Sequence, residues 1–238
     1  TLIIFFIKTI VHCCRPPYFH QVILKQIIDI GFYSLPVVGL TTLFSGMVLA
    51  LQSYNGFARF SSESAVATVV ALSITRELGP VLAGLMVTGR VGSSIAAELG
   101  SMKVTDQIDA LKILATDPFD YLIAPRVIAC TLCLPVLVLI GDIIGILGGF
   151  MIGVYKLGFN SSTYLNQTVS YLEISDIVSG LIKASVFGFL LGVMGCYHGY
   201  NCSRGAQGVG LATTNAVVSG CILILIFNYL LTELFFTS

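Results

Sequence analysis

The chain consists of long apolar stretches joined by short polar segments. A bilayer-spanning helix needs about 20 consecutive, mostly apolar residues, and several stretches reach that length. They cover approximately residues 35–57, 66–91, 127–154, 177–197 and 211–235. The pattern predicts an all-α, polytopic membrane protein with about five transmembrane helices and with its two ends on opposite sides of the membrane.

The N-terminal stretch 2–30 is also apolar, but Arg15, Pro16 and Pro17 interrupt it. Proline lacks a backbone donor and breaks helices, so we do not expect this stretch to span the bilayer. It predicts one or two helices lying in the membrane interface. The sequence therefore divides into an interfacial region, residues 1–30, and a transmembrane domain, residues 31–238.

Composition supports the membrane assignment. Hydrophobic residues make up 56% of the 238-residue chain and charged residues only 10%, whereas an ordinary soluble domain carries about 25% charge. So few charges could not cover a soluble surface without large exposed apolar patches. The formal net charge is zero, so nothing in the charge balance indicates a nucleic-acid partner.

Basic residues indicate the orientation, because Lys and Arg concentrate in cytoplasmic loops. Only Arg59 and Lys156 fall on one side of the predicted spans. The other side holds Lys8, Arg15, Lys25, Arg90, Lys103, Lys112, Arg126 and Arg204. We therefore expect the N-terminus and residues 98–126 in the cytoplasm, and residues 156–176 and the C-terminus on the outer side.

Residues 98–126, here named the charged segment, concentrate charge in an otherwise apolar chain. Besides Arg126, its charged residues are Glu98, Lys103, Asp106, Asp109, Lys112, Asp117 and Asp120. A membrane protein that keeps so much charge in one internal loop is expected to contact something outside the bilayer with it. The open alternative is a solvated loop without a partner.

Inside the charged segment, the pattern predicts an amphipathic helix of about 12 residues over 104–115, about 18 Å long. Its apolar positions recur at helical spacing, and its acidic positions lie opposite. The apolar positions are Val104, Ile108, Leu111 and Ala115, and the acidic ones are Asp106 and Asp109. We expect Thr105 to cap this helix, which would put Asp106 in its first turn, and Asp117-Pro118 to end it.

Arg76 and Glu77 lie near the middle of the second predicted span. A charged residue at a helix centre costs about 2.5–3.5 kcal/mol even on the lenient insertion scale. They either form ion pairs with neighbouring helices or border a water-accessible cavity, and the fork of an arginine suits a phosphate there. Gly79-Pro80 follows at once, and a proline kink could open such a cavity.

Two further charges, Asp142 and Lys183, fall within the third and fourth predicted spans. We expect them to pair with each other; the alternative is that each lies close enough to the end of its span to reach water. Small residues also recur four apart in Gly141-x-x-x-Gly145, Gly149-x-x-x-Gly153 and Gly188-x-x-x-Gly192, which lets membrane helices approach closely. These faces serve either packing within one chain or a homodimer seam along the third or fifth span.

Three motifs resemble the MlaE-family permeases, the membrane subunits of ABC transporters that move phospholipids. Asp106-Gln-Ile-Asp-Ala-Leu111 resembles the family's cytoplasmic Glu-x-x-Asp-Ala-Leu motif, with Asp in place of the first Glu. Residues 72–82, LSITRELGPVL, resemble its second span, and residues 205–218, GAQGVGLATTNAVV, resemble the entry to its last span. The similarity covers about residues 35–235, and residues 2–30 fit the family's interfacial elbow helix more weakly.

The resemblance implies that the charged segment contains a coupling helix that docks on a separate ATPase. The implied coupling residues are Glu98, Asp106, Asp109, Ala110 and Leu111, and the implied lipid-binding residues are Arg76, Glu77, Leu78 and Tyr54. The chain has no Gly-x-x-x-x-Gly-Lys-Ser/Thr sequence for a nucleotide, so we expect a transport subunit and not an enzyme. Neither a cofactor nor a metal is expected, and Cys130-x-x-Cys133 is interpreted as two small membrane-core residues.

The resemblance further implies a glycerophospholipid cargo, a second copy of the chain and an outer-side lipid-binding protein of the MCE type. It also implies a bacterial inner-membrane location and a role in outer-membrane lipid asymmetry. Two rivals stay open. One is an ion-coupled secondary transporter, although such folds usually contain internal repeats and none is evident. The other is a membrane anchor for an ATPase that transports nothing.

Overall fold

The structure is a computed structural model, described here for residues 2–14, 19–57 and 65–236. Over these residues it contains helices and no strands. Arg15, Pro16, Pro17 and Arg59, which entered the predictions above, lie outside the described residues. Five helical stretches are long and apolar enough to cross a membrane: His20–Phe57, Ala65–Val104, Phe119–Lys156, Ile174–Tyr200 and Ala206–Phe235. The predicted fold class is confirmed.

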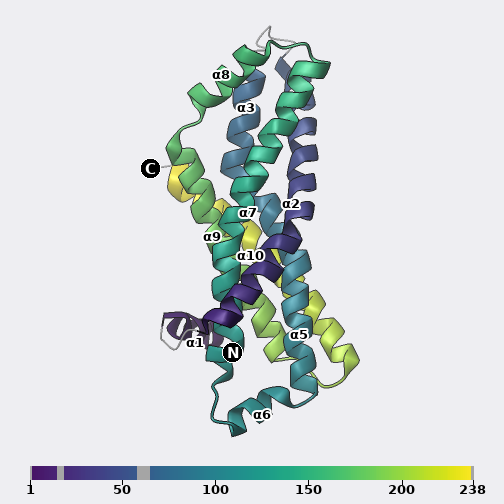
Figure 1. Ribbon diagram of the computed structural model, residues 1–238, viewed down its shortest axis with the longest axis vertical. Helices are drawn as coiled ribbons and strands as arrows, with labels where there is room; N and C mark the ends of the chain where they lie inside the picture. The colour runs from purple at the N-terminus through teal and green to yellow at the C-terminus, as the bar shows by residue number, and fades with distance from the viewer. Residues whose placement is uncertain (1, 15–18, 58–64, 237–238) are drawn as a thin grey trace.

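The first span, α2 (His20–Phe57), begins well before the predicted start at residue 35. Residues 20–30 are therefore not a separate interfacial helix, because the helix runs through the predicted boundary at residue 30. Pro36 lies inside α2, and Figure 1 shows α2 changing direction along its length. Proline is a sufficient cause of such a bend. A separate apolar helix, α1 (Leu2–Cys14), precedes it.

The second span is built from five consecutive elements, three α-helical and two π-helical. They are α3 (Ala65–Ser73), η2 (Ile74–Leu78), α4 (Gly79–Val87), η3 (Thr88–Gly92) and α5 (Ser93–Val104). π-Helical turns are rare and frequently occur at functional sites. Here each one carries an arginine, Arg76 in η2 and Arg90 in η3.

The remaining elements form a charged connection, the third span, a short outer helix and the last two spans. The connection contains α6 (Gln107–Ile113) and leads to η4 (Phe119–Ile123). The third span continues through α7 (Ala124–Met151) and η5 (Ile152–Lys156), and is followed by α8 (Ser161–Tyr171), α9 (Ile174–Tyr200) and α10 (Ala206–Phe236). Asn160 caps α8, because its side chain accepts hydrogen bonds from the backbone N–H groups of Ser162 and Thr163.

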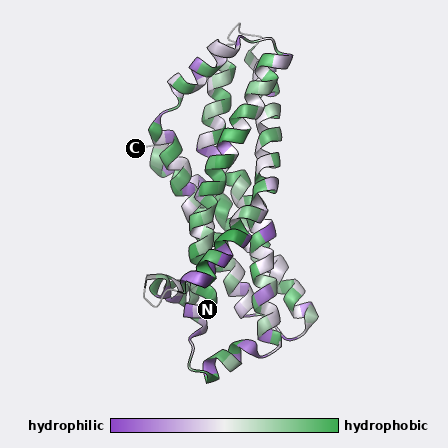
Figure 2. Cartoon of the chain, viewed as in Figure 1, coloured by the Kyte–Doolittle hydropathy of each residue, from purple (hydrophilic) through white to green (hydrophobic). Residues whose placement is uncertain are grey.

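The elements place α6 at one end of an elongated bundle and α8 at the other (Figure 1). The charged segment and the 156–176 loop therefore lie at opposite ends, as predicted. Figure 2 shows hydrophobic residues predominating along the long helices, with hydrophilic residues prominent in α8 and around α6. The core is contributed by all five spans and includes Phe187, Leu134 and Ile224.

The small-residue faces serve packing within the chain. A side-chain carbon on Gly145 would press on Ile74 and on the backbone of Thr42 in α2, and one on Gly188 would collide with the backbone of Cys130 in α7. Close approach of helix backbones requires glycine at such positions. The faces that we considered for a homodimer seam on the third span are therefore occupied by α2 and α3. Cys130 and Cys133 are buried in the same core.

Candidate functional site

The centre of the molecule contains a charged network formed by η2, α9 and α10, here named the central charged network. Its charged members are Arg76 and Glu77 on η2 and Asp176 and Lys183 on α9. An ion pair joins Arg76 Nη2 to Asp176 Oδ1 at 2.7 Å, and a second joins Lys183 Nζ to Glu77 Oε1 at 2.7 Å. Adjacent helical residues point about 100° apart, which explains why Arg76 and Glu77 reach different partners.

Polar groups of α10 complete the central charged network. Thr232 Oγ1 donates to Glu77 Oε1 at 2.9 Å, and Asn228 Nδ2 donates to Glu77 Oε2 at 3.0 Å. Lys183 is fully buried, and a buried charge is tolerated only when it is paired and hydrogen-bonded. The network therefore ties η2, α9 and α10 together, because separating either ion pair would leave a charge without its partner.

Pro80 explains why Lys183 points to this place. In an α-helix the N–H of residue 80 would donate to the carbonyl of residue 76, but proline has no N–H. Lys183 Nζ donates to the carbonyl oxygen of Arg76 at 2.9 Å instead. The N–H of Gly79 reaches back to the carbonyl of Ile74, which forms the π-helical turn. The sequence Arg-Glu-Leu-Gly-Pro thus creates both the π-helical turn and a carbonyl oxygen without its usual backbone donor. The Lys183 ammonium donates to that oxygen.

The predicted pair between Asp142 and Lys183 is wrong. Lys183 is engaged by Glu77, and Asp142 lies on α7 beside Gly79, where any side-chain carbon on the glycine would collide with the carboxylate. Asp142 is buried, and among the described residues its Oδ1 has no hydrogen-bond partner. The prediction failed because it matched charges by depth in the membrane, while the rotation of α9 turns Lys183 towards η2.

An apolar groove adjoins η2. It has a volume of about 480 Å³ and lies between α2 and the η2–α4 part of the second span, with Leu78, Leu82 and Gln52 among its lining residues. Leu78, the residue after Glu77, therefore lines an open groove. Tyr54 does not line this groove; its ring packs edge-on against Phe159, with centroids 5.8 Å apart.

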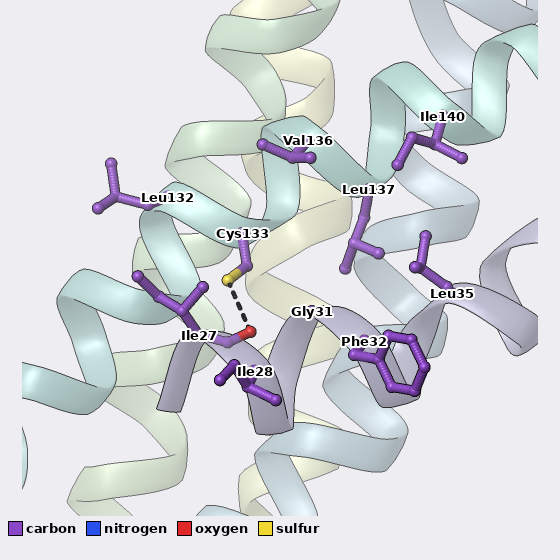
Figure 3. A pocket seen from close by; sticks show the side chains of 10 residues that line it. All are labelled: Ile27, Ile28, Gly31, Phe32, Leu35, Leu132, Cys133, Val136, Leu137 and Ile140. Carbon is purple, nitrogen blue, oxygen red and sulfur yellow. Dashed lines mark hydrogen bonds between the residues drawn. The ribbon is translucent and has the colours of Figure 1, made fainter. Parts of the chain in front are cut away.

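A second apolar groove of about 480 Å³ lies between the first part of α2 and α7. Figure 3 shows Ile27, Gly31 and Phe32 of α2 facing Cys133 and Val136 of α7 across it. The Cys133 thiol donates to the carbonyl of Ile27, with the sulfur 3.6 Å from the oxygen. The groove has apolar walls and lies on membrane-spanning helices.

The charged segment forms a shorter helix than predicted. α6 covers seven residues, Gln107–Ile113, in place of about twelve. Thr105 does not cap it; its hydroxyl donates to the carbonyl of Ser101 at 2.9 Å. Asp106 is the residue at the N-cap, in the left-handed conformation with φ 55° and no side-chain capping bond. The helix ends at Ile113, before Asp117-Pro118, and Ala115 also has a positive φ of 56°.

The predicted apolar face is only partly present: Ile108 and Leu111 face the bundle, whereas Val104 and Ala115 lie outside α6 and Ala115 is exposed. Ile108 is fully buried and Leu111 packs against the core, while Asp109 faces solvent between Lys103 and Lys112. Its carboxylate lies 3.3 Å from Lys103 Nζ and 2.8 Å from Lys112 Nζ. These two cations lower the pKa of Asp109, with Lys112 the larger cause.

Two large apolar side chains beside Asp109 project outwards, a feature that sequence reasoning missed. Ile113 is 86% exposed and Leu114 is 73% exposed. They lie at the end of α6, outside the five spans. Exposed apolar side chains rimmed by polar residues mark a contact with a protein or a membrane. A run of two apolar residues directly after Lys112 was the available sequence signal.

An ion pair joins the two ends of the charged segment. Arg126 Nη2 lies 3.1 Å from Glu98 Oε2, and Arg126 Nη1 donates to the carbonyl of Leu122 at 2.8 Å. Glu98 is thus not on α6; it holds the end of α5 to the start of α7. At the same end of the molecule, His12 Nδ1 of α1 lies 2.6 Å from Asp120 Oδ1 of η4, which fastens α1 to the charged segment.

Comparison with known proteins places these features in a family. A sequence model described as Permease MlaE matches residues 23–234. A probable ABC transporter permease protein of Rickettsia bellii is 63% identical over 98% of this chain and 90% of the relative. The intermembrane phospholipid transport system permease protein MlaE of Haemophilus influenzae is 38% identical over 90% of this chain and 82% of the relative. The chloroplastic protein TRIGALACTOSYLDIACYLGLYCEROL 1 of Arabidopsis thaliana is 39% identical over 90% of this chain and 61% of the relative.

Proposed function

The chain belongs to the MlaE permease family, and we propose that it is the permease subunit of an ABC transporter that moves glycerophospholipids. It is a multi-pass membrane protein with five helices of spanning length. A phospholipid transport permease of Haemophilus influenzae is similar over nearly the whole chain. The further proposals below concern the lipid site, the motor and the partners.

The observation that carries the lipid proposal is the contact between a charged turn and an apolar groove at η2. Arg76, whose side chain is 36% exposed, bonds Asp176 Oδ1 through Nε and Nη2, and its planar fork would exchange this carboxylate for the lipid phosphate. Leu78, two residues on, lines the groove of about 480 Å³ that would take an acyl chain. Glu77, neutralised by Lys183, would hold the turn in place, and Tyr54 would lie further along the route towards the outer end.

We further propose that a separate ATPase docks on α6. Support comes from the exposed carboxylate of Asp109, the apolar pair Ile113 and Leu114, and the buried Ile108 that anchors the helix to the bundle. Asp106, Ala110 and Leu111 belong to the same turn-and-helix unit. The ion pair between Glu98 and Arg126 would transmit a displacement of α6 to α5 and α7.

The remaining partners are also proposals. A second copy of the chain would pack against α10, the least buried of the five spans, where Val218, Ile222 and Leu225 are exposed. An outer-side lipid-binding protein of the MCE type would receive or deliver the lipid at the end that carries α8. The location would be a bacterial inner membrane, and the transport would maintain outer-membrane lipid asymmetry.

Lipid transfer between vesicles tests these proposals, with the permease reconstituted with and without its ATPase. We expect transfer to require the ATPase and to fall at least about tenfold in Arg76→Gln, which corresponds to about 1.4 kcal/mol. Transfer that persists without the ATPase would favour an ion-coupled transporter. Undiminished transfer in Arg76→Gln would favour a membrane anchor for an ATPase that itself transports nothing.

Charge reversal at Asp109 tests the docking surface. Asp109→Lys should weaken binding of the ATPase in a pull-down, because it replaces the only acidic residue of α6 with a cation. Lys156→Glu is the matched control, since it reverses an exposed charge at the opposite end of the bundle. Equal binding by both variants would show that α6 is not the docking site.

A further inference from the structure

A polar pocket lies on the same span as Arg76, nearer the end that carries α6. It has a volume of about 190 Å³, roughly that of six water molecules. It lies between the first part of α2 and the η3–α5 part of the second span. Its polar lining residues are Gln26, Asp29 and Tyr33 from α2, and Arg90, Ser94 and Glu98 from the second span.

Arg90 is held rigidly at the wall of this pocket. Its Nη2 donates to the backbone carbonyls of Asp29 at 2.9 Å and Ile30 at 3.1 Å, and to Ser34 Oγ at 2.7 Å. Its Nε donates to Ser34 Oγ at 3.1 Å. A guanidinium carries five N–H donors. The bonds between Arg90 and the described residues involve Nε and Nη2 and leave Nη1 unused. A positioned cation with donors left over is suited to bind a phosphate oxygen.

Two carboxylates, those of Asp29 and Glu98, line the same pocket as Arg90. Arg90 bonds the backbone of Asp29 and not its carboxylate, and Glu98 is shared with Arg126 on the far side. The pocket thus offers one cation and two anions. A ligand that complements it carries a phosphate and an ammonium group close together, whereas a purely anionic headgroup would meet repulsion from both carboxylates.

The pocket lies at the depth expected for lipid headgroups of the cytoplasmic leaflet. Residues 30–57 of α2 contain no charged residue, so Asp29 marks the limit of the apolar stretch. Arg90 lies fourteen residues, or about 21 Å along a helix, from Arg76 near the middle of the second span, which exceeds half of the hydrocarbon thickness of about 30 Å.

We propose that this pocket binds the phosphoethanolamine headgroup of a phospholipid in the cytoplasmic leaflet. Arg90 contacts the phosphate, and Asp29 and Glu98 contact the ammonium group. The pocket is a second lipid station, separate from the one at η2, and selects zwitterionic headgroups with a free amine. The inference rests on the proposed phospholipid transport and adds a headgroup class and a location to it.

The test is lipid binding by the purified full-length chain, measured by native mass spectrometry with phosphatidylethanolamine and phosphatidylglycerol of identical acyl chains. We expect the wild type to retain phosphatidylethanolamine in preference to phosphatidylglycerol. Asp29→Asn should reduce that preference several-fold while leaving the backbone bond to Arg90 in place. Arg90→Gln should weaken retention of phosphatidylethanolamine by about tenfold, or about 1.4 kcal/mol.

Two control variants separate this inference from the proposed function. Lys25→Gln removes a cation from the same part of α2 outside the pocket and should leave the preference unchanged. Arg76→Gln should abolish transfer by the η2 site while retaining the headgroup preference of the second pocket. An unchanged preference in Asp29→Asn overturns the inference whether or not Arg90→Gln folds. Unimpaired transfer in Arg76→Gln instead refutes the η2 site and leaves this pocket standing.

Discussion

The central charged network and the charged segment use the same residue types in opposite ways. In the centre, Lys183 is fully buried and its partner Glu77 accepts bonds from α9 and α10. On α6, Asp109 is exposed and bridges two lysines that are themselves exposed or half-buried. Buried pairs are costly to break, whereas exposed pairs contribute little. One region therefore stabilises the bundle, whereas the other leaves its charges at the surface.

The largest effect on stability should distinguish the buried from the exposed apolar residues of α6 and its end. Ile108 is fully buried, and truncation of a buried isoleucine to alanine costs about 2–5 kcal/mol. We expect Ile108→Ala to lower the denaturation midpoint markedly and Leu114→Ala, at an exposed position, to change stability by less than about 0.5 kcal/mol. Leu114→Ala should instead weaken ATPase binding. Similar unfolding midpoints for both variants would show that α6 is not anchored through Ile108.

Breaking the central charged network should produce the next largest effect. Lys183→Met leaves Glu77 without its cation and the carbonyl of Arg76 without its donor. Loss of one partner from a fully buried pair costs about 3–5 kcal/mol. Because the Glu77 side chain left behind is 36% exposed, we expect the free energy of unfolding in detergent to fall by less, about 1–3 kcal/mol. The double variant Lys183→Met, Glu77→Gln should recover part of the loss. A loss below about 1 kcal/mol in the single variant would contradict the assigned pairing.

The smallest effect should come from the exposed charges of α6. Lys112 and Lys103 lower the pKa of Asp109 below its ordinary value of 3.8. Because the folded-state pKa is the lower one, the associated stability is present above about pH 4 and is lost as the pH falls through the folded pKa. We expect Lys112→Met to raise the pKa of Asp109 in an NMR titration. An unaltered titration curve would mean that the pair with Lys112 does not form.

Much of the fold could be predicted because hydrophobic length is a local property. The five spans, the position of α6 and its buried Ile108 follow from apolar runs and helical spacing. Helix ends were predicted less well, since α2 and the second span continue past their apolar runs into polar residues such as Asp29 and Glu98. The cap of α6 was wrong for a similar reason: Thr105 bonds back into α5, and Asp106 takes the left-handed conformation that makes the turn.

The partners of buried charges were harder to predict. Arg76 and Glu77 were identified as a pair of special residues, yet Asp176 was not considered and Lys183 was assigned to Asp142. Asp176 and Lys183 are seven residues apart on α9, two turns along one face, and that spacing was the available signal. Which helix this face meets depends on how five spans rotate around one another, and spacing within a single helix contains no such information.

The sequence by itself determined that this chain enters a membrane, where it crosses, which end holds the charge and to which family it belongs. These follow from the cost of placing polar groups in hydrocarbon and from motifs contiguous along the chain. Only the tertiary structure decided that Lys183 donates to the carbonyl left without a donor by Pro80, that the glycine faces meet α2, α3 and α7, and that Arg90, Asp29 and Glu98 line one pocket. Those contacts join residues up to 107 positions apart, and side-chain packing between helices selects them.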